Sequence, residues 1–245
     1  MAIHNTYNLA GRVALVPGGL GGLGAAVSRA FARSGASVVI AGSQERPAEL
    51  SALRDGLGEH AERLTFTRAD ALDEDQVEAL VRSVIQQHGR LDILLNTVGG
   101  WMAGQPITGL DRATWRRMLD INLDAAFLLA KHAARPMQQQ AWGRILHVSS
   151  RAARSGRRNA AAYAVAKNAV LTLTEIQAEE LRDFGVTVNA ILPSIIDTSA
   201  NRASMPNADF SRWPKADEVA AVLLFLASED ARLITGASIP VYGAG

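Results

Sequence analysis

The feature that most constrains the fold is a regular alternation of two kinds of segment along the chain. Short apolar runs rich in β-branched residues alternate with stretches of helical periodicity from one end to the other. Because these runs are almost continuously apolar, they are typical of strands in a parallel sheet whose two faces are both covered by helices. The expected strands are Arg12–Val16, Ser37–Ala41, Leu64–Thr67, Asp92–Leu95, Arg144–Val148, Thr187–Leu192 and Ser238–Val241.

Helical periodicity is clearest between residues 73 and 88, where apolar side chains recur on one helix face. Asp73 with Gln76 resembles a capping box at the start of this helix, and Gly89 predicts its end. Repeated β–α units of this length predict right-handed crossovers. We therefore expect an α/β fold with one doubly wound sheet of about seven mostly parallel strands and helices on both faces.

The chain is expected to form one domain. No linker rich in proline, glycine or serine divides the 245 residues, and we find no internal repeat. Residues 1–245 are therefore interpreted as a single unit. The stretch without clear periodicity is 199–213, which is predicted to be a lid over a substrate site, with a plain connecting loop as the alternative.

Composition and charge argue against several classes of function. The 25 basic and 24 acidic residues nearly balance, so no nucleic-acid partner is expected. The chain has no cysteine and its histidines are scattered, so no metal site is expected. No apolar stretch approaches the roughly 18 residues that suggest a membrane span, and we see no signal peptide, so the expected location is the cytoplasm.

One basic cluster stands out from this even distribution. It consists of Arg151, Arg154, Arg157 and Arg158. Our main interpretation is a solvated loop or a subunit contact, and the alternative is contact with an anionic substrate or a phosphate.

A glycine-rich turn, Gly18–Gly24, follows the first expected strand and precedes an apolar helix over 25–33. Glycines at such a junction allow a tight turn and a close approach of the backbone to a pyrophosphate. The helix N-terminus then presents unpaired N–H groups to the phosphates. The turn lacks the Gly-Lys-Ser/Thr ending of nucleoside triphosphatases, so it predicts a dinucleotide site.

The second expected strand indicates which dinucleotide is bound. It ends at Gly42-Ser43-Gln44, without the carboxylate that usually binds the ribose hydroxyls of NAD. Ser43 and Arg46 could instead accommodate a 2′-phosphate, so NADP is the preferred cofactor, although NAD stays possible through Glu45. Asp70 is a candidate partner for the adenine amino group, or it caps the turn before residue 73.

The clearest chemical pattern is Ser150 followed by Tyr163 and Lys167. Tyr163 and Lys167 are four residues apart and therefore share one face of a helix. A lysine ammonium one turn away is expected to lower the pKa of the phenol, which is ordinarily near 10. Tyr163 could then exchange a proton with a substrate oxygen to which Ser150 donates a hydrogen bond.

Together these motifs resemble the short-chain dehydrogenases/reductases over essentially the whole chain. The resemblance implies a Rossmann-like fold and an NAD(P)-dependent oxidoreductase that interconverts a carbonyl and an alcohol by hydride transfer, with Tyr163 as general acid and base. The catalytic set that it implies is Asn122, Ser150, Tyr163 and Lys167. The implied cofactor contacts, with Ser43 and Asp70 added from the reasoning above, are Gly18, Gly22, Leu23, Gly24, Ser43, Asp70, Asn96, Gly99, Tyr163, Lys167, Pro193, Ile196 and Thr198.

The same resemblance assigns individual roles. Asn122 would hold a water in a proton relay through Lys167, which would also bind the nicotinamide ribose. The backbone of Ile196 and the Thr198 hydroxyl would fix the carboxamide, and Asn96 would steady the central sheet. Family members commonly form dimers or tetramers through helices corresponding to residues 115–137 and 160–182, so a homotetramer or homodimer is expected.

The chain departs from the family pattern at several positions, which are Pro17, Thr97, Val98, Ser194 and Tyr242. These departures concern cofactor geometry and substrate choice, because no reactive group is lost. Two local segments, 99–101 and 205–213, are similar to dihydropteridine reductases, a branch that generally prefers NADH and lacks the serine. Pterin reduction is therefore the alternative activity, and a cofactor-binding regulator without catalysis or an epimerase or dehydratase are further alternatives.

The substrate site is expected to contain large apolar side chains from the site loops. The candidates are Trp101, Met102, Trp142, Met205, Phe210 and Trp213. Trp101, Phe210 and Trp213 are the predicted substrate contacts and favour a small carbonyl or alcohol substrate that is flat or apolar. Ordinary core or interface packing is the alternative for each of them.

Overall fold

The centre of the fold is a parallel sheet. The structure is a computed structural model that describes residues 7–244. The predicted domain boundaries, residues 1 and 245, lie outside this range. Within it, seven strands lie in the order β3-β2-β1-β4-β5-β6-β7, and every pairing between neighbours is parallel. The strands are β1 (Val13–Pro17), β2 (Ser37–Gly42), β3 (Leu64–Arg68), β4 (Ile93–Asn96), β5 (Gly143–Val148), β6 (Val186–Pro193) and β7 (Ser238–Val241).

The predicted α/β fold with a doubly wound sheet is confirmed. Each predicted strand lies within one residue of the observed one at both ends. The differences arise because the backbone ladder continues into residues that interrupt the apolar pattern, such as Pro17, Gly42 and Arg68. Pairing is a property of backbone groups, so side-chain hydrophobicity locates a strand better than it locates the strand's last residue.

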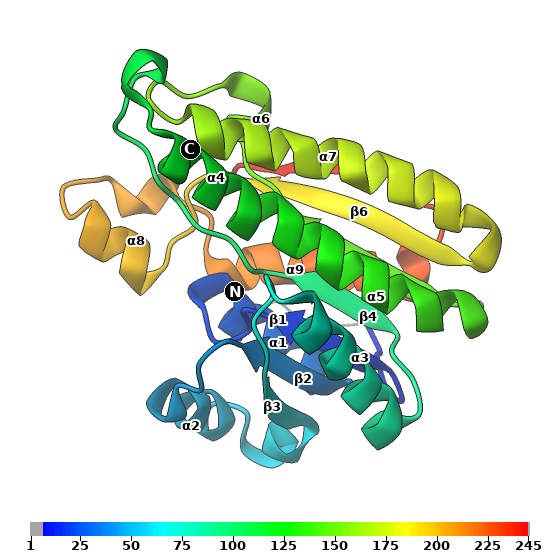
Figure 1. Cartoon of the computed structure of the whole chain (residues 1–245). Helices are drawn as coiled ribbons and strands as arrows, with labels where there is room; N and C mark the ends of the chain where they lie inside the picture. Colours follow the sequence, from blue (N-terminus) through cyan, green and yellow to red (C-terminus); the bar gives the residue numbers. More distant parts are fainter. Residues whose placement is uncertain (1–6, 245) are drawn as a thin grey trace.

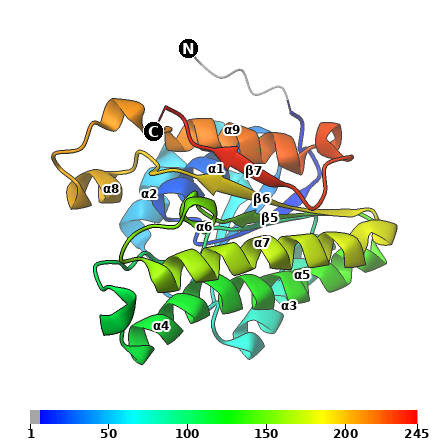
Figure 2. The same cartoon turned by 90° about the horizontal axis from the view of Figure 1, so that it is seen from above.

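Helices cover both faces of the sheet, as Figure 2 shows edge-on. One face carries α1 (Gly22–Arg33), α2 (Pro47–Asp55) and α9 (Ala216–Ala227). The other carries α3 (Glu74–His88), α4 (Arg112–Leu119), α5 (Ala125–Gln139) and α7 (Ala161–Leu181). Two short helices, α6 (Ala152–Ser155) and α8 (Ser199–Ser204), follow β5 and β6 at the carboxyl edge of the sheet (Figure 1).

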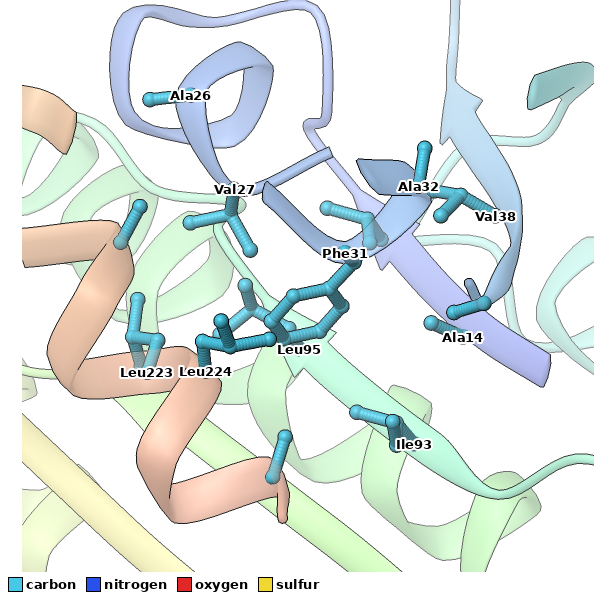
Figure 3. Packing of buried hydrophobic residues seen from close by; sticks show 14 of the residues in the cluster. Ala14, Ala26, Val27, Phe31, Ala32, Val38, Ile93, Leu95, Leu223 and Leu224 are labelled. Atoms are coloured by element: carbon cyan, nitrogen blue, oxygen red, sulfur yellow. The ribbon is translucent and has the colours of Figure 1, made fainter. Parts of the chain in front are cut away.

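The core consists of two main clusters of buried apolar side chains, one on each face of the sheet. On the first face, the ring of Phe31 on α1 is fully buried and points toward Leu95 on β4 and Leu224 on α9 (Figure 3). On the second face, α3 begins where expected, because the Asp73 carboxylate accepts the N–H of Gln76. Its last turn ends at Gly89, which has a φ of +75°.

A polar network ties the amino ends of the strands together. The Asp92 carboxylate is completely buried and accepts hydrogen bonds from the Val13 N–H (2.9 Å) and from the guanidinium groups of Arg12 (3.1 Å) and Arg90 (2.6 and 2.7 Å). Trp142 belongs to this region, since its indole lies 3.6 Å from the Arg12 guanidinium carbon. The prediction of Trp142 as a pocket residue was therefore wrong.

The strand order also creates the position at which a ligand can enter. β1 and β4 are neighbours although their crossovers leave in opposite directions, which opens a crevice at their carboxyl ends. The glycine turn follows β1 at this edge, and the segment 97–100 follows β4. The topology thus brings the predicted cofactor segments to one place.

The buried His147 on β5 predicts how the stability of the fold depends on pH. Burial lowers the pKa of His147 from 6.5 to about 4, and its Nε2 lies 3.0 Å from Oε1 of Gln177. The unfolded chain therefore takes up a proton near pH 6.5, whereas the folded chain does not until near pH 4. We expect this group to reduce the free energy of unfolding by up to about 3 kcal/mol as the pH falls through this range.

Urea unfolding of the wild type and of His147→Gln at several pH values would test this expectation. The glutamine can hydrogen bond but does not titrate, so the slope between pH 6.5 and 4 should decrease by about one proton. If the free energy of unfolding of His147→Gln depends on pH as steeply as that of the wild type, His147 is not the group responsible.

Candidate active site

A cleft of about 1280 Å³ opens at the carboxyl ends of β1, β4, β5 and β6. It brings together segments far apart in the chain, from residue 18 to residue 213. Most of the predicted site residues line it. They are Gly18, Gly22, Leu23, Gly24, Gly99, Trp101, Asn122, Ser150, Tyr163, Lys167, Pro193, Ile196, Thr198 and Trp213.

Four predicted site residues do not line this cleft. Ser43 and Asp70 follow β2 and β3, and the Asp70 carboxylate accepts the N–H of Leu72 at 3.0 Å. Asn96 is buried at the end of β4, where its Oδ1 accepts the N–H of Val98 at 2.9 Å. Phe210 packs instead against Trp213, with ring centroids 4.9 Å apart, and under the guanidinium of Arg202.

Of the other pocket candidates, Met205 lines the cleft and Met102 does not. Neither Met102 nor Phe210 lines the cleft, and Phe210 as a substrate contact stays a prediction. A residue's place in a loop sequence does not set the direction of its side chain, because the neighbouring segments decide which side is covered.

Two glycines of the turn, Gly22 and Gly24, leave no room for a Cβ atom. A Cβ on Gly24 would lie 2.3 Å from the carbonyl oxygen of Gly18, and one on Gly22 would lie 2.5 Å from Cγ2 of Thr198. Helix α1 begins at Gly22, so the last glycines of the turn form its first turn rather than preceding it. Backbone N–H groups at a helix start, unobstructed by side chains, form the kind of site in which a pyrophosphate binds.

Two departures from the family pattern, Pro17 and Thr97, contact each other beside this turn. Pro17 has no N–H to donate. Its carbonyl oxygen accepts hydrogen bonds from the Thr97 hydroxyl (2.7 Å) and from the Thr97 N–H (3.1 Å). These bonds join the ends of β1 and β4 beneath the turn. Sequence reasoning missed the contact because the two residues are 80 positions apart.

Asn122 lies in a π-helical turn, Asp120–Asp124, between α4 and α5. Its side chain is buried, and its amide nitrogen donates to the carbonyl oxygens of Met118 (3.0 Å) and Gly100 (3.1 Å). Its Oδ1 accepts the N–H of Gly100 at 3.2 Å. The π-helical turn thus places the Asn122 amide next to the loop after β4, and the hydrogen bonds to Gly100 fix that loop beside the cleft. Such π-helical turns are frequent at functional sites.

Tyr163 and Lys167 lie on α7, one turn apart, and Ser150 follows β5. Ser150 and Tyr163 both line the cleft. The Lys167 ammonium is buried and donates to the carbonyl oxygen of Val148 at 2.8 Å. The hydroxyl of Ser149 donates to the carbonyl oxygen of Lys167 at 2.7 Å, a contact that was not predicted and that fastens α7 to the end of β5.

The structure corrects the expected cause of the Tyr163 pKa. Burial raises this pKa above its ordinary value of 10, and the Ser150 hydrogen bond and the charge of Arg157 oppose the rise. Lys167 is not among these causes: its own burial lowers its pKa to about 8, and its Nζ lies 5.9 Å from the centroid of the phenol ring. The expectation that Lys167 makes the phenol acidic was therefore wrong here, because desolvation outweighs the nearby charge.

The segment 199–213 forms one wall of the cleft. Thr198 caps α8 by accepting the N–H of Asn201 at 3.2 Å, and the Asn201 amide donates to the carbonyl oxygen of Ile196 at 2.8 Å. Arg212 donates to the carbonyl oxygen of Ala244 at 3.1 Å, which joins this segment to the chain after β7. The Thr198 hydroxyl oxygen accepts the hydrogen bond that caps α8, so the hydroxyl proton stays available for a hydrogen bond to a ligand in the cleft.

Residues 7–244 lack two features, a cluster of metal-binding side chains and a membrane-spanning helix. Their side chains include no group of three or more histidine and acidic residues arranged to hold a metal ion. No helix in this part of the chain has the length and apolar character needed to cross a membrane.

Comparison with known proteins gives the family. A model of the short-chain dehydrogenases/reductases, described as enoyl-(acyl carrier protein) reductase, matches residues 18–243. The chain is 36% identical over 241 residues to cis-4-hydroxycyclohexanecarboxylate dehydrogenase of Sinomonas cyclohexanicum, covering 95% of both proteins. It is 34% identical to (+)-borneol dehydrogenase 2 of Salvia officinalis, covering 96% of this chain and 89% of the relative.

A solved structure agrees with these relatives. ElxO with NADP bound superposes with a TM-score of 0.87 at 27% identity, covering 95% of this chain and 97% of the other. The protein belongs to the short-chain dehydrogenase/reductase family and is an oxidoreductase of the kind that acts on alcohols and carbonyls.

Proposed function

We propose that the protein interconverts a secondary alcohol on a small apolar ring with the corresponding ketone, using NADP in preference to NAD. The observation that carries this proposal is the grouping of Ser150, Tyr163 and Lys167 in the cleft that also contains the glycine turn. The two relatives described above are named for alicyclic alcohols, which supports a substrate whose alcohol lies on a ring. A bound nicotinamide dinucleotide would supply or accept the hydride.

In this proposal the chain's own residues position the substrate and move the proton. Tyr163 gives its hydroxyl proton to the carbonyl oxygen in reduction and takes it back in oxidation. Ser150 donates a hydrogen bond to the same oxygen, an interaction that can lower the barrier by about 3 kcal/mol. Lys167 binds the nicotinamide ribose. The relay water at Asn122 stays a prediction, since this amide binds Gly100.

The choice of NADP rests on the charges at the ends of β2 and β3. β2 ends without a carboxylate, and the Arg68 guanidinium donates to the carbonyl oxygen of Ser43 at 3.0 Å. Arg46 lies in the same loop, 3.5 Å from Glu49. Two arginines flanking Ser43 favour a 2′-phosphate, and the ElxO neighbour holds NADP.

We extend the proposal to assembly, location and the lid. Exposed apolar side chains lie along α5 and α7, at Phe127, Val165 and Ile176, which supports a homodimer or homotetramer through this face. We propose the cytoplasm because an oxidoreductase of this kind needs a supply of nicotinamide cofactor. Residues 199–213 would act as the substrate lid. Light scattering and cell fractionation test the first two proposals.

The activity itself is tested by following cofactor absorbance with (+)-borneol and cis-4-hydroxycyclohexanecarboxylate, each with NADP⁺ and with NAD⁺. We expect oxidation of at least one alcohol and a higher kcat/KM with NADP⁺. A quinonoid dihydropterin with both reduced cofactors tests the pterin alternative. Cofactor binding without turnover of any substrate would favour the non-catalytic regulator and would contradict the proposal.

A further inference from the structure

The charges around the cleft are unevenly distributed. The end formed by the glycine turn has no charged side chain among its lining residues. The rest of the lining contains Lys167, four arginines and a single acid, Asp209; the arginines are Arg151, Arg157, Arg158 and Arg212. The charged part of the cleft lining is therefore strongly positive.

Two of these arginines are already engaged within the protein. Arg212 binds the carbonyl oxygen of Ala244, and the Arg151 guanidinium carbon lies 5.5 Å from the centroid of the Tyr242 ring. Arg157 and Arg158 form neither an ion pair with an acid nor a side-chain hydrogen bond within residues 7–244, and the one ring contact of the pair is that of Arg157 with Trp101. An exposed arginine pair without an acidic partner, at the rim of a substrate cleft, can accept an anion at little cost.

Arg157 is held close to the reacting group. Its guanidinium carbon lies 5.0 Å from the centroid of the Trp101 ring, and Trp101 meets Tyr163 edge to face with ring centroids 4.6 Å apart. The loops that carry Trp101 and Arg157 lie side by side (Figure 1), and the N–H of Gly104 donates to the carbonyl oxygen of Asn159 at 2.9 Å. The Trp101 ring thus contacts both the guanidinium and the tyrosine ring.

Stacking on the indole face leaves the N–H edges of a guanidinium available for hydrogen bonds. A small ring with its carbonyl at Tyr163 would lie beside Trp101 and direct its far side toward Arg157. Arginine and a carboxylate form paired, charge-assisted hydrogen bonds that fix orientation as well as charge. A negatively charged substituent of the substrate that binds Arg157 would therefore determine the orientation of the substrate ring in the cleft.

We propose that the substrate carries a carboxylate, which binds Arg157 with Arg158 adding positive charge, while the carbonyl or alcohol carbon lies at Tyr163. This inference rests on the proposed function and specifies its substrate class. The effect of Arg157 on the Tyr163 pKa agrees with this placement, because it shows that the guanidinium lies within electrostatic range of the phenol.

The test compares matched pairs of ketones that differ only in charge, 4-oxocyclohexanecarboxylate against 4-oxocyclohexanecarboxamide and the two 3-oxo isomers. For the wild type we expect kcat/KM to favour the acid in at least one pair by about 10- to 100-fold, the usual value of hydrogen bonds to a charged group. Arg157→Gln should bring this ratio close to one, and Arg157→Lys should restore part of it. The preference should also weaken as ionic strength rises.

Arg154→Gln is the control, because Arg154 is an exposed arginine of the same cluster that does not line the cleft. It should keep the wild-type ratio. Equal use of acid and amide in both pairs would overturn the inference, as would an equal loss for both members in Arg157→Gln. If cyclohexanone is reduced and neither keto acid is, the inference that the substrate carries a carboxylate is wrong, but the proposed function stands. If no ketone is reduced with either cofactor, the proposed function itself fails.

Discussion

Replacing Tyr163 by phenylalanine is expected to lower kcat by about 10²- to 10⁴-fold, the usual contribution of a positioned proton donor. The ring would keep its edge-to-face packing against Trp101, so the cleft and the affinity for the dinucleotide should stay close to those of the wild type. Steady-state kinetics and a cofactor titration by fluorescence would measure the two quantities separately.

The control for this prediction is Tyr7→Phe, which removes a phenol hydroxyl from a ring that packs against Phe225 and does not line the cleft. It should leave kcat unchanged. Wild-type turnover in Tyr163→Phe would exclude Tyr163 as the proton donor and acceptor.

The raised pKa of Tyr163 also predicts the pH profile. In reduction the neutral phenol is the active form, so a phenol with a pKa above 10 stays competent across the neutral and mildly alkaline range. In oxidation the phenolate must accept the proton, so the rate should rise as the pH increases toward that pKa. Removal of Arg157 takes away a charge that favours the phenolate and should move this rise to higher pH.

Asp92→Ala is expected to have the largest effect on stability. The substitution leaves the guanidinium groups of Arg12 and Arg90 and the N–H of Val13 without their shared acceptor at a fully buried position. Breaking a fully buried pair costs about 3–5 kcal/mol, and we expect a loss near the lower end of this range, because the Arg12 and Arg90 side chains are 24% and 42% exposed and Arg12 keeps its pair with Glu229. For a domain of this size the loss corresponds to a fall in Tm of roughly 10 °C.

Thermal and urea unfolding would measure this loss. Asp217→Ala is the matched control, because Asp217 also pairs with an arginine, Arg29, at 3.3 Å, but its side chain is 74% exposed. Exposed pairs contribute at most about 1 kcal/mol, so the control should unfold close to the wild type. Equal losses in the two variants would show that burial does not determine the strength of the Asp92 network.

Local patterns in the sequence predicted the elements and the repeating order of the fold. The near-continuous apolar runs locate each strand within one residue, because burial on both faces of a parallel sheet requires them. The glycine turn and the four-residue spacing of Tyr163 and Lys167 depend only on neighbouring residues. The family resemblance added the Rossmann-like fold, whereas the order of the strands along the sheet came from the structure.

The tertiary structure decided which of these residues meet and in what electrostatic environment. Trp142 and Trp101 look alike as loop tryptophans, yet one packs at the amino ends of the strands and the other against Tyr163. The tyrosine–lysine spacing predicted an acidic phenol, whereas burial by distant segments raised the Tyr163 pKa. Desolvation and long-range charge shift a side chain's pKa according to the residues that pack around it. The residues that line this cleft come from five separate parts of the chain.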